Sequence, residues 1–411
     1  MAKKENNVAD KTSKKIKIWL FIVSFIFFFP FIGVFINEIK FAYICDLYTL
    51  GLDRKDFFTV WIALFGAIGI AFNIYQNHLR TTNQDKQLVN QNKQLEKQAE
   101  QIQLQGTQIE LQSKSQRDSR FSKGVELLGN SNESARTGAA YSLFFLAKDY
   151  PEEFKRPVFE VLCSHIRSMT NTEEYKTKNI TRPSNEIQSV INLLFQNPES
   201  IDLFKELDAD LMGCYLKGVD LIEVNFTGAK LSRTNLEYSF ICDATLENAF
   251  LVGTKLQNST IKSSNLSNAN LENSDLKGAY LSKINLSNAK LSNAELCKVT
   301  LSEVNLSDAQ LIHSNLSNAT ITFDSKLVRT TLTNSNLSGA NLSGADLTEA
   351  KLNSADLSNA QLYDCILIDT FFSVKTNLAG VDLSEVDISR IKGKIDSLYT
   401  FFLNNKETGS Q

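Results

Sequence analysis

The stretch NLSNANLENSDLKGAYLSKINLSNAKL, residues 265–291, places a leucine at every fifth position. The same spacing extends in both directions, and from Leu211 to Ile321 all 23 such positions hold Leu, Ile or Phe. One extra residue then shifts the frame, and ten further positions run from Leu327 to Phe372. A second one-residue shift leads to Leu378, Leu383 and Ile388. A period of five fits neither an amphipathic helix nor a strand.

The positions around each large residue explain the period. A small residue stands two places before almost every large one, often with Asn or Asp between them, as in Ala269-Asn270-Leu271. Gly, Asn and Asp recur two places after it, where they tolerate unusual φ angles. The pattern predicts a chain that turns a corner every five residues, so that four sides close a square coil with the large and small residues inside. With four repeats per coil, about 36 repeats form about nine coils. Coils stacked at about 4.8 Å then give a rod about 40 Å long. Proline would remove a stacking donor, and none occurs after Pro198.

A family resemblance supports this interpretation. Runs such as SGANLSGADLTEAKLNSADL, residues 338–357, resemble the A(D/N)Lxx signature of the pentapeptide-repeat family. The resemblance covers Ala209 to about Ile388 and implies a right-handed quadrilateral β-helix. Upstream, RFSKGVELLG at 120–129 and EIQSVINLLF at 186–195 resemble the leader of membrane-anchored bacterial members of the family. No common activity follows from that resemblance.

Two apolar runs precede these segments. Residues 18–36 (IWLFIVSFIFFFPFIGVFI) and 57–75 (FFTVWIALFGAIGIAFNIY) each hold 19 uncharged residues, close to the ~20 that span a bilayer core as a helix. They predict a transmembrane hairpin over residues 18–75. A secretory signal peptide is the alternative for the first run, although its usual apolar region has only about 7 to 15 residues. The basic residues 1–17 predict that the N-terminus and residues 76–411 lie on the cytoplasmic side of the inner (cell) membrane.

The region between the membrane and the rod is predicted to be helical. Residues 76–116 are rich in Gln, Asn and Lys and contain no Pro, which predicts a polar helical stalk. Leu or Ile recurs there every seventh residue, but the partner positions are mostly polar, so weak self-association is expected rather than a strong coiled coil. The seven-residue series is Leu88, Leu95, Ile102 and Ile109. Helical spacing broken at Pro151 and Pro157 predicts a small helical domain over 117–207, which can cap the N-terminal end of the rod. Residues 391–411 are expected to form a short helix that caps the other end or pairs two rods in a homodimer.

The predicted fold class is therefore α+β: a two-helix transmembrane hairpin, a helical stalk and a small helical domain, followed by the quadrilateral β-helix over residues 208–390. The chain of 411 residues is 43% hydrophobic and 22% charged, with a net charge of −3, which excludes a collagen-like or wholly disordered chain and a strongly basic nucleic-acid binder. Six scattered cysteines without a CxxC motif indicate free thiols in a reducing compartment.

The sequence offers no converging set of reactive groups. His78, His165 and His313 lie in three different segments, and no Walker A loop, GxGxxG, HExxH or EF-hand loop occurs. In the helical domain, Glu126, Arg136 and His165 are interpreted as surface or capping groups. We predict no catalytic, cofactor-binding or metal-binding residues, and we predict that the chain is not an enzyme.

Aromatic residues interrupt the normally polar position of the repeat. Phe240 and Tyr280 are 40 residues apart, so they should lie on the same side of the rod two coils apart, about 10 Å, with Tyr238 nearby. The others are Tyr215, Phe250 and Phe371. We predict that Tyr238, Phe240 and Tyr280 form a partner surface. Simple tolerance of aromatic residues on a β surface is the alternative.

These features predict a scaffold, anchored in the lipid bilayer, that presents a cytoplasmic rod to a protein partner. One alternative is a membrane effector in stress or phage defence, whose hairpin perturbs the bilayer. Another is a DNA-mimicking topoisomerase modulator, a role that some pentapeptide-repeat proteins have. Residues 211–390 carry a net charge of −5 with lysines interleaved among the acids, which is a weak negative potential for a duplex mimic. Nucleic acid is not an expected partner.

Overall fold

The computed structural model describes residues 15, 17–19, 21–23, 54–322, 324–382, 386 and 392–393. The chain divides into two compact units, Met1–Ile109 and Glu110–Gln411, and each is described by itself. The predicted C-terminal helix over 391–411 lies outside the described residues except for 392–393, which form a short strand.

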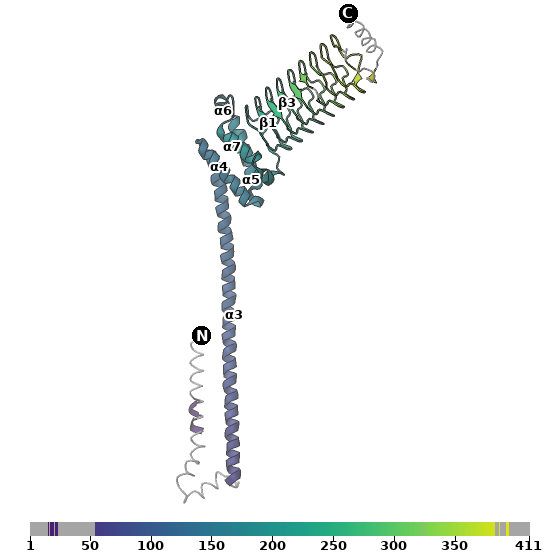
Figure 1. Cartoon of the computed structure of the whole chain (residues 1–411). Coiled ribbons are helices and arrows are strands. Elements are labelled where there is room, and N and C mark those ends of the chain that lie inside the picture. The colour runs from purple at the N-terminus through teal and green to yellow at the C-terminus, as the bar shows by residue number, and fades with distance from the viewer. Residues whose placement is uncertain are drawn as a thin grey trace. The chain divides into compact units, whose positions relative to one another are not determined.

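Helix α3, Arg54–Leu128, is a single helix of 75 residues that contains both the predicted second span, 57–75, and the predicted stalk, 76–116. Figure 1 shows it as an unbroken ribbon. No proline interrupts it, so its backbone hydrogen bonds can continue from turn to turn. The helix therefore passes the boundary at 116 without a break and ends at Leu128, inside the range assigned to the helical domain.

The start of α3 is apolar. Among the described residues, one helix is long and apolar enough to cross a membrane, judged by length and composition, and it runs from Thr59. None of the apolar window is buried against other parts of the protein. The predicted first span, 18–36, lies mostly outside the described residues, and of its residues 18, 19 and 21–23 are helical.

Five helices form a small domain between α3 and the rod. They are α4 (Glu133–Asp149), α5 (Pro151–Thr170), α6 (Glu173–Lys178), α7 (Asn185–Phe195) and α8 (Pro198–Phe204). Polar residues start several of them: the Asn132 side chain accepts a hydrogen bond from the N–H of Ala135, and Ser184 caps α7 in the same way. Apolar residues of α4, α5 and α7 form the core, which includes Phe144, Leu162 and Ile191.

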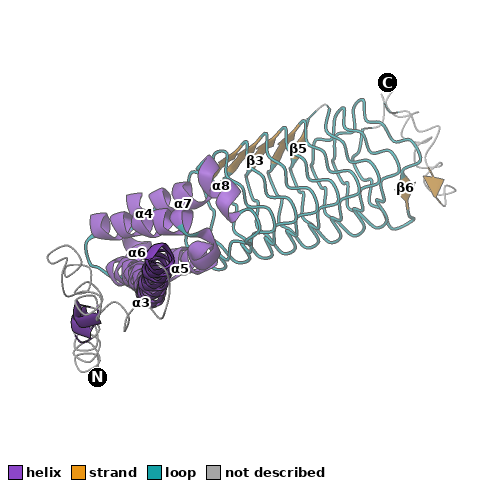
Figure 2. Ribbon diagram, turned by 90° about the horizontal axis from the view of Figure 1, so that it is seen from below, coloured by secondary structure: helices purple, strands orange, loops and turns teal. Residues whose placement is uncertain are grey.

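The rod is a stack of coils whose backbones pair at a distance of twenty residues along the chain. On one side the pairing forms a five-stranded parallel sheet in the order β1-β2-β3-β4-β5. Its strands are β1 (Phe240–Cys242), β2 (Thr260–Lys262), β3 (Tyr280–Ser282), β4 (Thr300–Ser302) and β5 (Thr320–Ile321). On the other sides, isolated parallel bridges such as Asn265↔Asn285 and Lys230↔Phe250 do the pairing. Near the far end β6 (Phe371–Phe372) pairs with β7 (Lys392–Gly393). The predicted β-helix is confirmed, and Figure 2 shows its coils stacked beside the helical domain.

The position of each repeat residue follows the predicted pattern. The large and small residues are buried, including Ile284 at a position that elsewhere holds a small residue. The Asn or Asp before the large residue accepts a hydrogen bond from the N–H two residues later, as Asn285 Oδ1 does from Ser287 at 3.1 Å. This bond closes the turn and gives the physical reason for the Asn/Asp preference.

From Leu211 to Leu316 and from Leu327 to Leu367, the corner two places after each large residue adopts a left-handed backbone whatever residue stands there. Gly213 has a φ of 70°, but Arg233 and Tyr238 have 61° and 58°. A non-glycine residue pays about 1 to 2 kcal/mol for this conformation. Stacking of the coils therefore imposes the corner, and glycine, asparagine and aspartate only make it easier to form.

Each one-residue frame shift is absorbed between two coils. The pairing distance is 21 residues at Asn305↔Lys326 and returns to 20 at Lys326↔Asp346. At the second shift, Asp356 pairs with Asn377, again 21 residues away. The extra residue enlarges one side, and the stack continues in alignment.

The first coil has no preceding coil to pair with, and the helical domain supplies hydrogen-bond partners in its place. The Gln188 side chain of α7 accepts a hydrogen bond from the Asp220 N–H at 3.0 Å and donates one to the Asp220 carbonyl at 2.8 Å. One amide thus satisfies both backbone groups that a preceding coil would have paired. On another side, Arg167 Nη1 donates to the Asp210 carbonyl at 2.5 Å.

Two further sides of the first coil are closed by α5 and α7. The N–H of Tyr215 donates to Thr170 Oγ1 at 3.4 Å, and the N–H of Asn225 donates to the Phe195 carbonyl at 3.0 Å. A buried coil edge without such partners would leave orphaned donors. The predicted role of the helical domain as the N-terminal cap is confirmed by these contacts.

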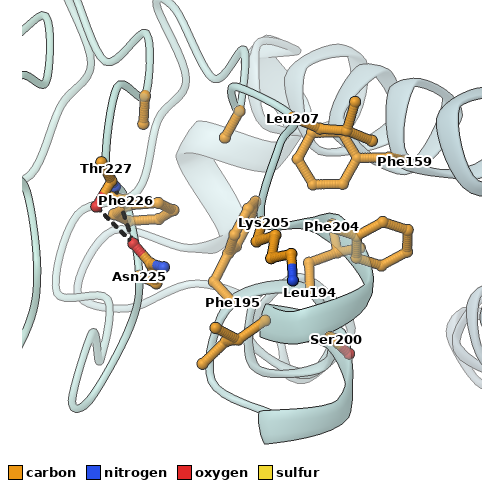
Figure 3. Close-up of a pocket in the computed structure, with 13 residues that line it drawn as sticks. Phe159, Leu194, Phe195, Ser200, Phe204, Lys205, Leu207, Asn225, Phe226 and Thr227 are labelled. Carbon is orange, nitrogen blue, oxygen red and sulfur yellow. Dashed lines mark hydrogen bonds between the residues drawn. The ribbon is translucent and has the colours of Figure 1, made fainter.

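Aromatic rings fill the junction between the cap and the first coil. The centroid of Phe195 lies 4.7 Å from that of Phe226 and 6.0 Å from that of Phe159, which is 5.1 Å from Phe204. Figure 3 shows these side chains around a cavity of about 30 Å³, which Leu207 and Lys205 also line. The space is of the order of one water molecule, so it is a packing gap in the cap rather than a ligand site.

Candidate partner surface

Strand pairing aligns Phe240 with Tyr280, the two aromatic residues that the five-residue spacing predicts to lie on the same side of the rod. Phe240 in β1 pairs with Thr260 in β2, which pairs with Tyr280 in β3, so the two aromatic side chains lie in one column two coils apart. The predicted alignment of Phe240 and Tyr280 is confirmed. Their side chains point outward and are 53% and 40% exposed.

Tyr238 occupies the corner just before this column. Its left-handed φ of 58° carries the ring to the edge of the sheet side, where it is 50% exposed. Ile222, one coil earlier on the same side, is also exposed. The three aromatic residues and Ile222 therefore form an apolar area at the cap-proximal end of the sheet; we call it the aromatic face.

Two lysines lie over the tyrosine rings of this face. The Lys217 ammonium is 5.0 Å from the centroid of Tyr238, and the Lys262 ammonium is 5.4 Å from that of Tyr280, both within the range of cation–π attraction. Lys217 also pairs with Glu237 at 3.2 Å. The hydrogen bond from Lys217 to Glu237 raises the pKa of the Lys217 ammonium, so the lysine remains charged beside the ring.

Most of the other outward positions of the sheet carry small hydroxyl side chains. Beyond the aromatic residues, the outward positions of the strands β1 to β5 hold one charged residue, Lys262. The uncharged outward residues of the sheet are Cys242, Thr260, Ser282, Thr300, Ser302 and Thr320. A partner that covered this side would have to desolvate few charged groups. The side therefore suits the core of a protein interface, which is depleted of charge, better than a contact held by ion pairs.

The other sides of the rod differ in chemistry. One column contains Lys230, Phe250, Lys290 and Lys351, linked through successive bridges. Another is a ladder of asparagines in which Asn285 Nδ2 donates to Asn265 Oδ1 at 3.2 Å, and the next coil repeats this bond. Phe250 is 50% exposed, but its neighbours in the column are Lys230 and Asn270. The structure therefore brings Tyr238, Phe240 and Tyr280 together and leaves Phe250 apart.

The helical domain contains a buried ion cluster that the sequence did not reveal. Glu186, 1% exposed, accepts hydrogen bonds from Arg136 at 2.8 and 2.5 Å and contacts His165 Nε2 at 2.6 Å. Burial alone would raise the pKa of Glu186, but the hydrogen bonds from His165 and Arg136 outweigh it, so this pKa is lowered. Glu186 is thus ionised and paired. It links α4, α5 and α7, and a buried pair of this kind fixes the helices relative to one another.

Arg136 and His165 were interpreted from the sequence as surface or capping groups. Both instead turn inward to Glu186, because three helices converge on that carboxylate. Glu126 is exposed and pairs with Lys123 at 2.9 Å, as a surface group does. A Glu in the first turn of an amphipathic helix gives no sequence signal of such pairing, since its partners lie 21 and 50 residues away.

Three thiols of the helical domain and the rod are buried. Burial raises the pKa of Cys163, Cys214 and Cys365 to about 12, which keeps them protonated at neutral pH. Over the described part of the chain, no group of three His, Cys, Asp or Glu side chains is arranged to hold a metal ion.

A second cavity, of about 570 Å³, opens on the helical domain at the starts of α4 and α7. Its walls hold cations and anions in similar number: Arg136, Lys178, Arg182, Glu133 and Glu174. Arg136 is already bound to Glu186, and Glu133 Oε1 accepts the N–H of Glu186 at 3.0 Å. Three cations and two anions line the cavity, so its walls carry no strong excess of one charge.

The segment that forms the coils is similar to a known family of repeats. A family model described as pentapeptide repeats matches residues 209–248, 242–278, 279–318, 325–362 and 355–392. No curated protein matches the chain.

Several solved structures are similar to the rod. HetL, a pentapeptide repeat protein involved in heterocyst differentiation regulation in the cyanobacterium Nostoc sp. strain PCC 7120, is 24% identical over 47% of this chain and 95% of its own, with a TM-score of 0.22. Another pentapeptide repeat protein from Nostoc, alr5209, is 27% identical over 25% of this chain and 84% of its own, with a TM-score of 0.22. QnrB1, a plasmid-mediated fluoroquinolone resistance protein, is 14% identical over 41% of this chain and 93% of its own, with a TM-score of 0.21.

Proposed function

We propose that the chain is a membrane-tethered, non-enzymatic scaffold whose rod binds a protein partner through the aromatic face. The match of residues 209–318 and 325–392 to the model of pentapeptide repeats, a fold of the protein-interaction type, supports this proposal. The observation that carries this proposal is the alignment of Phe240 and Tyr280 on a nearly uncharged parallel sheet, with Tyr238 at its edge. Aromatic enrichment and depletion of charge are the features that distinguish the core of a protein interface from ordinary surface.

The rod is suited to present such a face without deformation. Each coil pairs with the next through backbone hydrogen bonds. For example, the Tyr280 N–H donates to the Ser259 carbonyl at 2.9 Å. Aromatic rings held on paired strands lose little conformational freedom when a partner binds, and this lowers the entropic cost of association. Lysines over the tyrosine rings add a polar rim to the face.

Membrane tethering rests on α3 and on the flanking charges. The helix is apolar from Thr59 and uncharged over residues 57–75, and the upstream run 18–36 is of equal length. Basic residues concentrate before the first run, which supports a cytoplasmic location for the N-terminus and the rod at the inner (cell) membrane.

The non-enzymatic role is supported by how the polar groups are used. Asn and Asp side chains of the repeats accept backbone hydrogen bonds, as Asp346 Oδ1 does from the Thr348 N–H at 3.0 Å. The one buried carboxylate of the helical domain among the described residues, Glu186, is held by Arg136 and His165. These groups maintain the fold and are not poised for chemistry.

A labelling experiment tests the partner surface. The full-length chain fused to a promiscuous biotin ligase is expressed in its native host with Phe240→Thr and Tyr280→Thr, residues that the same column already holds at Thr260 and Thr300. Loss of two interface aromatics at about 1 to 2 kcal/mol each should lower the labelling of the partner about tenfold or more.

Phe250→Thr is the matched control, since it removes an equally exposed aromatic from another column. The proposal fails if the double variant labels the same proteins to the same extent as the parent chain. It also fails if Phe250→Thr has the larger effect.

A further inference from the structure

Helix α3 contains a second internal repeat, with a period of seven. Residues 87–114 read QLVNQNK, QLEKQAE, QIQLQGT and QIELQSK. In each heptad the first and fifth residues are Gln and the second is Leu or Ile. A period of seven, sustained over four heptads, keeps one stripe of a helix facing the same direction when the helix is slightly supercoiled. We call the second-position residues the heptad seam: Leu88, Leu95, Ile102 and Ile109.

The heptad seam lies open in the single chain. Its four side chains are 61%, 62%, 68% and 67% exposed in chain order. The four heptads cover about 40 Å of helix at ~1.5 Å per residue. Water-exposed leucine and isoleucine at such regular spacing favour association with another helix of the same period. Leu104 and Leu111, at the fourth position, lie outside the seam.

Charges are sorted away from the heptad seam. Within the four heptads every charged residue stands at the third, fourth or seventh position: Lys93, Glu96, Lys97, Glu100, Glu110 and Lys114. The first, second, fifth and sixth positions, which border the contact in a two-helix coil, carry no charge. Such a contact surface does not repel an identical copy of itself, and it offers no charge for a partner of opposite sign.

We propose that the heptad seam binds the seam of a second copy of this chain, in a parallel and in-register pair of α3 helices. In that arrangement like faces like, so that Leu95 meets Leu95 and Gln98 meets Gln98 of the other copy. The glutamine amide is both donor and acceptor and can hydrogen-bond to another glutamine. An antiparallel pair would place each Leu or Ile against a Gln, leaving apolar layers incomplete and amides without partners.

This pairing is independent of the aromatic face, because it lies on a different part of the chain. With one large apolar residue per heptad, the seam is weaker than a coil with two. Association then depends on a high effective concentration, as when two copies are confined in one compartment or membrane. The experiment must therefore use the full chain where it is expressed.

Disulfide cross-linking distinguishes the seam from the outer surface of the same helix turn. Gln98→Cys places a thiol in the contact, whereas the neighbouring Lys97→Cys places one on the outer side. We expect Gln98→Cys in the full-length chain, treated in cells or membranes with an oxidation catalyst, to give several-fold more product at twice the chain mass than Lys97→Cys. The unsubstituted chain measures cross-linking through the native cysteines.

A second variant tests whether the apolar residues carry the pairing. Leu95→Gln with Ile102→Gln keeps good helix formers and should reduce the Gln98→Cys product to the level of Lys97→Cys. Equal cross-linking at 97 and 98 overturns the proposal, as does a Gln98→Cys product that survives loss of both seam residues. A cross-linked product whose mass is not twice that of the chain would show a different occupant and also overturn it.

Discussion

The rod and helix α3 are both built on an internal repeat, but they treat their large apolar residues in opposite ways. Leu271 and Leu291, at positions of the five-residue repeat, are fully buried, whereas Leu95 and Ile102, at positions of the seven-residue repeat, are more than 60% exposed. A chain that turns at every fifth residue returns to its starting side after one coil and stacks on itself. A straight helix never returns, so its seam stays open until another helix covers it.

Because of this difference, the two regions are stabilised in different ways. In the rod, the pairing of successive coils and burial of one large residue per repeat occur within one chain, and only the end coils require other elements. Along α3, the backbone hydrogen bonds are local, and the residues of the heptad seam contribute little until a partner is present. Substitutions of the same kind should therefore have different effects in the two regions.

The largest difference is expected for truncation of leucine. Leu291→Ala removes a fully buried side chain and leaves a cavity between coils, so it should lower the free energy of unfolding of the rod by about 2 to 5 kcal/mol. Leu95→Ala exchanges an exposed residue for a better helix former and should change stability by less than about 0.5 kcal/mol. Denaturant unfolding of the full-length chain in detergent, followed by circular dichroism, measures both.

Hydrogen exchange assigns each change to its region. Faster exchange in Leu291→Ala should be confined to the rod, with the coils containing residues 271 and 311 affected most, since they adjoin the cavity. Comparable losses for the two variants, measured at a dilution where the chain is single, would contradict the view that α3 leaves its heptad seam unburied.

Most of the rod could be predicted from sequence because its determinants are periodic. Spacing alone aligned Phe240 with Tyr280, and two one-residue shifts located the places where pairing distance changes to 21. The burial of Ile284 and the left-handed corner at Tyr238 were not predicted, because the stacked backbone imposes them against residue preference. Periodicity therefore predicts position well and local conformation less well.

The contacts of the cap could not be predicted, since they join unrelated segments. Gln188 pairs with the backbone of Asp220, 32 residues away, and nothing in an amphipathic helix marks one glutamine for that role. Glu186 likewise gathers Arg136 and His165 from two other helices. The lysines over Tyr238 and Tyr280 depend on which side chains adjacent coils bring together, which a single repeat does not specify.

Two glycines allow the first coil, which contacts the cap, to be compared with a coil inside the rod. Gly218 and Gly253 both have a φ of +66°, at corners where other coils hold Asn. A side chain at 218 would collide with the carbonyl oxygen of Thr181 in the cap, whereas at 253 it would meet only the Arg233 side chain at 3.7 Å. Gly218→Asn should destabilise the protein by about 1 to 3 kcal/mol through this clash.

Gly253→Asn is the control, and we expect a change of less than about 1 kcal/mol, because asparagine tolerates the left-handed conformation. Unfolding midpoints of the two variants in the same conditions provide the measurement. A larger loss at 253 than at 218 would show that corner strain, and not the approach of the cap, limits substitution.

The smallest effect is expected for the amide that imitates a coil. Gln188→Ala removes both hydrogen bonds to the Asp220 backbone and should cost about 1 to 2 kcal/mol, with faster hydrogen exchange at the Asp220 amide. Gln310→Ala is the control, because the preceding coil already pairs with both backbone groups at 310: the Gln310 N–H donates to the Ala289 carbonyl and the Gln310 carbonyl accepts from the Leu291 N–H. There the fold supplies its own partners, so a change of less than about 0.5 kcal/mol is expected. If the two substitutions had equal effects, the first coil would be as self-sufficient as the middle ones, and the cap would be dispensable to it.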